Sequence, residues 1–174
     1  MEQTRSRPTE LAALSSLPQT EFAARLGDIF EHSPWIAERA WHARPFTSAG
    51  ELHAAMLAVL DAATEQEKLG LIRAHPELAG KEAAAGTLTD ASTGEQQGAG
   101  LDRCSAEELA RLSGLNAAYY GRFGHPFVIA VKGLGRRQIL DAIEARLAND
   151  AAVEFRTCLR EIGKIARFRL DALT

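Results

Sequence analysis

The stretch "AAVEFRTCLREIGKIARFRLDAL", residues 151–173, decides the fold, because its apolar residues recur with the spacing of a helix. When these residues are projected at about 100° per residue, one face becomes almost wholly apolar. This face contains Phe155, Cys158, Leu159, Ile162, Ile165, Ala166 and Leu173. Arg169 falls at its centre, whereas Arg167 points the other way. We therefore predict a long helix that buries one face and turns one arginine inward.

Shorter stretches with the same spacing cover most of the chain, and several begin with a helix-start signal. Three open with the S/T-x-x-E pattern, in which two side chains satisfy backbone N–H groups at the helix start. The pairs are Ser48 with Glu51, Thr64 with Glu67, and Ser105 with Glu108. The predicted helices span residues 19–31, 34–43, 48–62, 64–74, 105–121, 136–148 and 151–173.

Only "PFVIAV", residues 126–131, has the β-branched apolar composition of a strand. Six residues cannot distinguish a buried strand from a buried loop, so both interpretations stay open. Residues 76–104 are rich in Gly, Ala, Ser and Thr and long for a loop, which favours a functional segment or partly irregular helices. The prediction is an all-α, single-domain bundle of about seven or more helices over residues 1–174, with residues 1–16 flexible.

Composition excludes several classes of function. The formal net charge is −3, and without a basic patch the chain has little to attract nucleic acid. Its two cysteines, Cys104 and Cys158, are too few for a disulfide framework and form no zinc or redox motif. Dinucleotide, P-loop, zincin and α/β-hydrolase motifs are lacking, so we expect no metal and no organic cofactor. With no signal peptide or membrane span in the sequence, we expect a cytoplasmic protein that binds no membrane.

The stretch "RAHPELAGK", residues 73–81, brings an apolar helical run to a histidine and then interrupts it with a proline. Pro76 disfavours the helical conformation at the residue before it, so the helix is expected to end near Ala74 with His75 at its carboxyl end. Imidazole titrates near neutrality, and a helix carboxyl end favours its protonated form. His75 is thus either an acid-base group or a residue that only caps the helix.

Two further groups of residues carry candidate chemistry. Ser92, Glu95 and Gln96 form an S-x-x-E-Q pattern, which is either another capping box or part of a site, and spacing alone does not choose. A guanidinium stays charged and is costly to bury alone, so an inward Arg169 needs a carboxylate or an anionic ligand. Two interpretations of Arg169 remain equally open. One is a structural ion pair with Glu95 or another core acid, and the other is a binding site for a small anion.

Seven motifs, taken in order, resemble one family. They are "IFEHSPWIAERA", "RPF", "AHPELAGK", "LTDASTGEQQGAGL", "LNAAYYGRFGHPFVIAVKG", "EARLAND" and "EIGKIARFRLDAL". Together they are similar to the 2-oxo-4-hydroxy-4-carboxy-5-ureidoimidazoline (OHCU) decarboxylase family, over nearly the whole chain. The resemblance implies an all-α fold, a homodimer, and a cofactor-free carboxy-lyase that converts OHCU to (S)-allantoin at the end of urate degradation.

The resemblance also implies which residues form the site. The essential histidine of the family matches His75, with Pro76 beside it, and the active-site Ser, Glu and Gln match Ser92, Glu95 and Gln96. Backbone that contacts the ligand matches Phe127, Val128 and Ile129, and an arginine of the last helix matches Arg169, with Arg167 as the second choice. We interpret His75 and Glu95 as catalytic and the others as substrate-binding. The alternatives are a helical ligand-binding or regulatory domain and a cofactor-free lyase acting on a related ureido acid.

Overall fold

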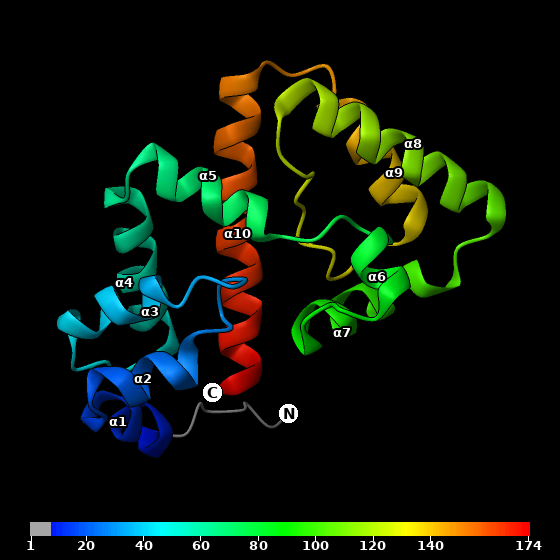
Figure 1. The fold of residues 1–174 in the computed structure, drawn as a ribbon. Helices are drawn as coiled ribbons and strands as arrows, with labels where there is room; N and C mark the ends of the chain where they lie inside the picture. The colour runs from blue at the N-terminus through cyan, green and yellow to red at the C-terminus, as the bar shows by residue number, and fades with distance from the viewer. Residues whose placement is uncertain (1–7) are drawn as a thin grey trace. The chain divides into compact units, whose positions relative to one another are not determined.

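The computed structural model describes residues 8–174, which are built from helices and contain no strand, so the all-α prediction is confirmed for this range (Figure 1). The α-helices are α1 (Pro8–Ser16), α2 (Gln19–Leu26), α3 (Trp35–Ala40), α4 (Ala49–Ala62), α5 (Glu65–Ala74), α6 (Lys81–Ala85), α7 (Asp90–Gly98), α8 (Ala106–Phe123), α9 (Arg136–Arg146) and α10 (Ala151–Leu173). Two short 3-10 helices, η1 (Trp41–Ala43) and η2 (Leu101–Arg103), follow α3 and α7.

The chain divides into two compact units, and the first comprises residues up to Leu71 together with Gly163–Thr174. Its described part contains α1 to α4, most of α5 and the end of α10. Within it, α3 packs against α2 and α4. The core of this unit is formed by fully buried side chains of the helical stripes, which include Phe22, Leu26, Ile36, Leu52 and Met56.

The second unit, Ile72–Ile162, contains the end of α5, helices α6 to α9 and the first half of α10. Helix α8 lies beside α9 (Figure 1). Fully buried Leu112, Tyr119, Phe127, Ile139 and Ile143 form its core. Four of these five come from α8 and α9, and Phe127 comes from the loop between the two helices.

Most predicted helices are present, and the differences have local causes. The helix predicted over 19–31 ends at Leu26, although Ile29 and Phe30 remain buried, because the segment after Gly27 continues as turns. Of residues 1–16, predicted to be flexible, Pro8–Ser16 form α1 and residues 1–7 lie outside the described range, so the flexibility stays a prediction. The segment 76–104 contains the short helices α6, α7 and η2, in agreement with partly irregular helices.

The apolar segment 126–131 is an irregular loop, which resolves the open choice between strand and loop. The stripe of α10 needs two corrections. Leu173 was predicted to be buried and is 48% exposed, whereas Glu154, at the other end of the same face, is 0% exposed. Helix α10 therefore carries a buried acid near its start as well as the predicted buried arginine near its end.

The predicted capping boxes at Thr64 and Ser105 form with both reciprocal hydrogen bonds. At Ser48 the hydroxyl caps the amide of Glu51, but the Glu51 carboxylate turns back to the amide and hydroxyl of Thr47. These caps satisfy backbone donors that would otherwise lack partners, and they explain why α4, α5 and α8 begin within one residue of their predicted starts.

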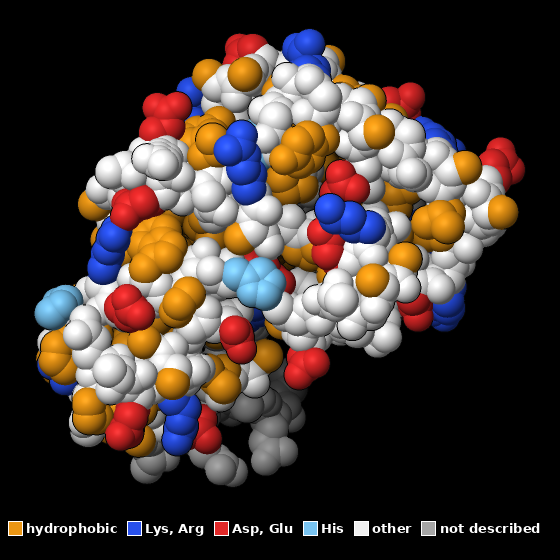
Figure 2. Space-filling model, viewed as in Figure 1, with side chains coloured by type: hydrophobic (Ala, Val, Ile, Leu, Met, Phe, Trp, Pro, Cys, Tyr) orange, Lys and Arg blue, Asp and Glu red, His pale blue; other side chains and the backbone are white. Residues whose placement is uncertain are grey.

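The surface mixes charges of both signs. On the face drawn in Figure 2, Lys and Arg side chains alternate with Asp and Glu, and hydrophobic side chains occur in small groups between them. This mixture agrees with the sequence, which has 20 basic and 23 acidic residues. Among residues 8–174, no helix combines the length and the apolar composition needed to cross a membrane.

Candidate functional site

His75 follows directly after the last residue of α5, as the proline rule predicts. Its amide closes the last turn by donating to the carbonyl of Ile72 at 3.2 Å. The histidine is only 8% exposed, so its ring lies against protein rather than in bulk water. A buried imidazole beside a helix end is suited to handle a proton in a place from which water is largely excluded.

The chain turns sharply after Pro76. Ala79 adopts φ +49°, a left-handed conformation that is uncommon for residues with a side chain. At Gly80 a Cβ atom would lie 2.8 Å from the Cβ of Glu77, so this position requires glycine. The small residues in this part of the sequence thus have a steric cause, since they allow the chain to fold back beside His75.

Helix α7 carries the S-x-x-E-Q residues, and its first turn removes the capping interpretation for Ser92. The N-cap of α7 is Thr89, whose hydroxyl accepts from the amide of Ser92 at 3.2 Å. Ser92 and Gln96 lie one turn apart and are both buried, and Glu95 beside them is partly exposed. The three side chains are therefore available for roles other than beginning the helix.

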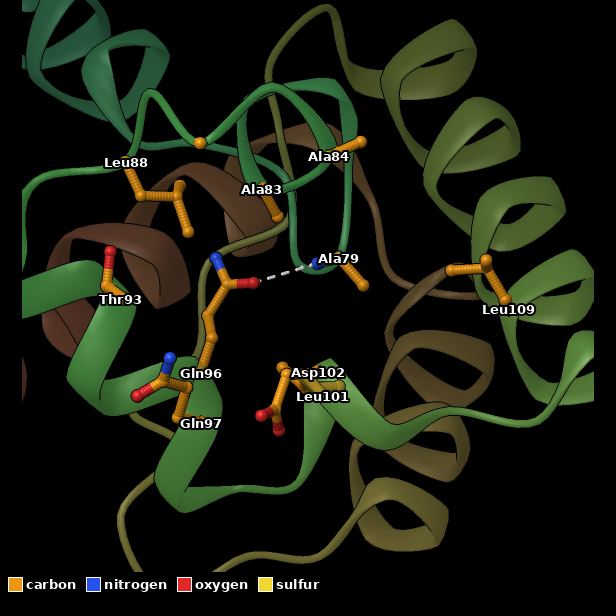
Figure 3. A pocket seen from close by; sticks show the side chains of 11 residues that line it. Ala79, Ala83, Ala84, Leu88, Thr93, Gln96, Gln97, Leu101, Asp102 and Leu109 are labelled. Carbon is orange, nitrogen blue, oxygen red and sulfur yellow. Dashed lines mark hydrogen bonds between the residues drawn. The ribbon is translucent and has the colours of Figure 1, made fainter.

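Gln96 connects α7 to the turn that follows His75. The amide N–H of Ala79 donates to Gln96 Oε1 at 2.9 Å, a bond drawn in Figure 3. On the neighbouring residue of the turn, the carbonyl of Leu78 accepts from Asn116 Nδ2 of α8 at 3.0 Å. Two buried carboxamides thus hold the strained turn, and sequence reasoning assigned no role to Asn116.

The bond from Ala79 also fixes the orientation of the Gln96 side chain. Because a backbone N–H can only donate, the atom facing it must be the carbonyl oxygen of the Gln96 amide. The NH₂ group of Gln96 then points away from this bond. In this orientation the NH₂ group of Gln96 can donate hydrogen bonds to an acceptor such as a carbonyl oxygen.

The loop 126–131 is buried and is held at two points. Arg146 Nη1 donates to the carbonyl of Val128 at 2.7 Å, and the amide of Ala130 donates to Glu161 Oε2 at 3.0 Å. Phe127 and Val128 are 2% and 4% exposed, whereas Ile129 is partly exposed. Arg146 lies in the motif "EARLAND" but received no role from the sequence, because its partner is eighteen residues away.

Arg169 lies in the first unit and is buried, in agreement with the helical projection. Its Nη1 is 2.8 Å from Glu31 Oε2 and donates to the carbonyl of Asp28 at 3.0 Å. Glu31 is therefore a core acid of the kind that the ion-pair interpretation required. Arg167, the second choice, is exposed and pairs with Asp171 one turn further along α10.

A cavity of about 460 Å³ lies in the second unit beside Gln96 (Figure 3). The described residues that line it come from the His75 turn, α6, α7, η2 and α8, and include Ala79, Thr93, Gln97 and Leu109. Neither His75 nor Glu95 is among them. The cavity thus borders one face of α7 and touches the candidate site only through Ala79 and Gln96.

The remaining histidines behave as packing or surface residues. His125 is 3% exposed and lies edge-on to Tyr119, with its Nδ1 3.0 Å from the carbonyl of Pro126. His53 contacts the carbonyl of Gly163 at 2.8 Å, whereas His32 and His42 are exposed. Within residues 8–174, no three His, Cys, Asp or Glu side chains gather as a metal site would require.

Comparisons with known proteins agree with the sequence resemblance. The family model for OHCU decarboxylase matches residues 15–171, a range that extends through both units. The chain is 41% identical over 160 residues to the 2-oxo-4-hydroxy-4-carboxy-5-ureidoimidazoline decarboxylase of Haloferax volcanii, covering 92% of this chain and 93% of that protein.

Two longer proteins are also similar. The uric acid degradation bifunctional protein PucL of Bacillus subtilis is 46% identical over 150 residues, which cover 86% of this chain and 30% of that protein. A crystal structure of (S)-allantoin synthase superposes with a TM-score of 0.73 at 31% identity, covering 93% of this chain and 53% of that one. This chain thus corresponds to only part of each of these two proteins. The family model matches most of the chain, and the similarity to the Haloferax volcanii protein extends over most of both proteins. The chain therefore belongs to the OHCU decarboxylase family.

Proposed function

We propose that this chain decarboxylates OHCU to (S)-allantoin, the last step of urate degradation, without a cofactor. The observation that carries the proposal is its membership of the OHCU decarboxylase family over residues 15–171, which contain every residue assigned a role below. The joined His75 turn and α7 support it, because they bring an acid-base group and a hydrogen-bond donor to adjoining parts of one unit.

The reaction makes two demands on the protein. Decarboxylation breaks the bond between a ring carbon of OHCU and its carboxylate, and the electron pair left by CO₂ must spread into the ring beside an imine-like nitrogen. The carbon that loses CO₂ also carries a hydroxyl, and it becomes a carbonyl of allantoin as this hydroxyl gives up its proton. The neighbouring ring carbon, which bears the ureido group, must receive a proton, and this proton must arrive on one face if a single enantiomer is to form. Charge that develops on the ring needs donors that are already in place.

We assign the proton transfer to His75. Imidazole is the side chain that both gives and takes protons near neutral pH, and its burial at the end of α5 limits competition from solvent. Glu95 orients the imidazole or accepts a hydrogen bond from the substrate. Pro76 contributes contact surface next to the histidine and fixes the backbone that presents it.

Substrate binding is assigned to the buried side of α7 and to the loop after α8. Gln96 donates its NH₂ group to a carbonyl oxygen of the ureido group or the ring, since its own oxygen is bonded to Ala79. Ser92, one turn earlier, binds a further polar atom of the substrate. The backbone of Phe127, Val128 and Ile129 completes the contacts.

Arg169 is assigned to the substrate carboxylate, in addition to its ion pair with Glu31. An arginine that binds the departing carboxylate stabilises the bound substrate as well as the transition state, so it raises affinity more than it raises kcat. We therefore expect Arg169→Ala to raise KM with a smaller effect on kcat. A KM equal to that of the wild type would remove Arg169 from the site and leave it a structural role only.

The deciding experiment is circular dichroism of the product after the purified protein is added to OHCU freshly generated from urate. Because OHCU also decays spontaneously, rate and handedness must be measured together. Fast growth of the (S)-allantoin signal is expected for the wild-type chain. His75→Asn should abolish most of the acceleration while its far-UV spectrum stays that of a folded helical protein.

The exposed His42 offers a matched control, because His42→Asn makes the same chemical change at a residue that contacts Gln19 and Trp41 and has no assigned role. This variant should retain wild-type turnover. Slow decay without optical activity in the presence of the wild-type chain would reject the proposed reaction. Retained turnover in His75→Asn would reject the role of the histidine.

We also propose that the enzyme acts as a homodimer in the cytoplasm, as the family resemblance and the sequence suggest. The free thiols of Cys104 and Cys158 are consistent with a reducing compartment. Light scattering coupled to size-exclusion chromatography should give twice the mass of one chain, and the mass of a single chain would reject the dimer.

A further inference from the structure

A buried polar cluster lies in the second unit behind the loop 126–131, and the proposed reaction uses none of its side chains. Its centre is Glu154, which is completely buried. Arg146 donates to Glu154 from Nε at 3.0 Å and from Nη2 at 2.8 Å. Asn149 Nδ2 donates to the other carboxylate oxygen at 2.9 Å, and the hydroxyl of Tyr119 also donates to Glu154.

These contacts keep the acid ionised. Burial opposes the charge on Glu154, but the hydrogen bonds from Arg146, Tyr119 and Asn149 outweigh burial and lower the pKa of the carboxyl. Burial and the contacts with Cys158 and Glu154 raise the pKa of Tyr119, so its hydroxyl stays a donor. The cluster is therefore a fully formed ionic network with one fixed arrangement.

Arg146 extends the network to the loop. Its Nη1 donates to the carbonyl of Val128 at 2.7 Å, and its guanidinium carbon lies 4.3 Å from the centre of the Phe127 ring. Tyr119 packs edge-on against the same ring, with the ring centres 5.3 Å apart. Two adjacent residues of the loop are thus held by members of one cluster, Phe127 through its ring and Val128 through its backbone.

A buried ion pair by itself is weak evidence for stability, because apolar side chains of the same size often serve as well. What apolar side chains cannot do is donate a directed hydrogen bond to the Val128 carbonyl. The planar guanidinium can serve Glu154 on one edge and Val128 on another at the same time, whereas the ammonium of lysine cannot reproduce this geometry.

We propose that Arg146 is a positioning residue for the reaction, which acts through the Val128 carbonyl and is itself oriented by Glu154. The inference rests on the proposed function, in which the backbone of residues 127–129 contacts OHCU. The network fixes the direction of these peptide groups, so that their remaining polar atoms meet the substrate without having to reorient. Arg146 touches the loop and not the reacting atoms.

The test compares Arg146→Lys with a matched variant of the same unit. Arg111 also pairs with a glutamate, Glu144, at 2.7 Å, but both side chains are exposed. For Arg146→Lys we expect kcat/KM for OHCU to fall at least about ten-fold, mainly through KM, with some loss of product handedness. Arg111→Lys should keep the kinetic constants of the wild type.

Hydrogen exchange provides a readout that does not need activity. In Arg146→Lys the backbone amides of residues 127–131 should exchange about ten-fold faster than in the wild type, with α8 and α9 unchanged. A variant with wild-type exchange in this loop and wild-type kcat/KM would overturn the positioning role. An inactive wild-type chain would instead overturn the proposed function, so the two failures are distinguishable.

If Arg146→Lys does not fold, Tyr119→Phe replaces it in the same assays. This change removes one hydrogen bond to Glu154 and keeps the ion pair and the ring that packs on Phe127. We expect only about a two- to five-fold loss in kcat/KM, because Glu154 loses one donor while the bond from Arg146 to the Val128 carbonyl is kept. Unchanged kcat/KM in a folded Tyr119→Phe protein would overturn the inference.

Discussion

Helix α10 contributes to two buried arginine–glutamate pairs, one in each unit. It supplies the arginine of the first pair and the glutamate of the second. In the first unit, Arg169 of α10 binds Glu31, which lies in the irregular segment after α2. In the second unit, Glu154 of α10 binds Arg146 at the end of α9. The charged atoms are 2.8 Å apart in both pairs.

Each arginine also donates to a backbone carbonyl of an irregular segment. Arg169 binds the carbonyl of Asp28 at 3.0 Å, and Arg146 binds that of Val128 at 2.7 Å. The pairs differ in the surroundings of the acid, because Glu154 also accepts hydrogen bonds from Tyr119 and Asn149. The same chemistry thus holds two irregular segments, one in each unit.

Removing Glu154, the acid of the second pair, should have the largest effect on stability. Glu154→Ala leaves the Arg146 charge buried without its carboxylate, and breaking a buried pair in this way costs about 3–5 kcal/mol. Urea unfolding followed by far-UV circular dichroism measures the change. Glu144→Ala, which breaks the exposed pair with Arg111, should cost less than about 1 kcal/mol. Equal losses in the two variants would contradict the importance of burial.

The pair of the first unit should respond in the same direction. Arg169→Met should lower the free energy of unfolding by about 3 kcal/mol, since the buried carboxylate of Glu31 loses its partner. In the double variant Arg169→Met/Glu31→Leu the buried charges are gone together, and stability should return to within about 1–2 kcal/mol of the wild type. Additive losses would show that the two residues do not act as a pair.

Much of the fold could be predicted from the sequence because it depends on local periodicity. Helix α10 has the predicted bounds, and the caps at Thr64 and Ser105 place two further helix starts. Helix α7 could not be given bounds from the sequence, because its glycines and polar residues produce no apolar stripe. The structure also shows that Thr89, rather than Ser92, is its cap, a choice that spacing alone could not make.

The networks were harder to predict, for a physical reason. Helical projection placed Arg169 inward, and the same projection places Glu154 on the face of Cys158, one turn away, but Glu154 received no assignment from the sequence. Arg146 and Asn116 hold backbone carbonyls that are far from them in sequence, and only the folded chain brings these groups together. The core could therefore be predicted from apolar periodicity. The polar contacts that hold the loops could be identified only in the structure.

Lowering the pH should also affect stability through Glu154, the acid of the second pair. Its pKa is lower in the folded chain than in an unfolded one, because the hydrogen bonds that it accepts outweigh the effect of burial. Such a carboxyl contributes stability above its unfolded pKa and loses that contribution as the pH falls toward the folded pKa. The free energy of unfolding should therefore decline more steeply between about pH 5 and pH 3 in the wild type than in Glu154→Gln. Parallel pH curves would contradict this assignment.

An exposed pair in the first unit should have the smallest effect on stability, even though its carboxyl titrates abnormally. Arg39 donates to both oxygens of Glu67, at 2.6 and 3.2 Å, and the amide of Thr64 donates at 3.0 Å. The bonds from Arg39, followed by that from Thr64, lower the pKa of Glu67 to about 2. Carbon-detected NMR titration of the side-chain carboxyl should give this value and show it rising in Arg39→Met. The urea midpoint of Arg39→Met should nevertheless stay close to that of the wild type, because an exposed ion pair contributes little to folding. A drop in midpoint as large as that of Arg169→Met would show that hydrogen-bond geometry, and not burial, determines what these pairs contribute.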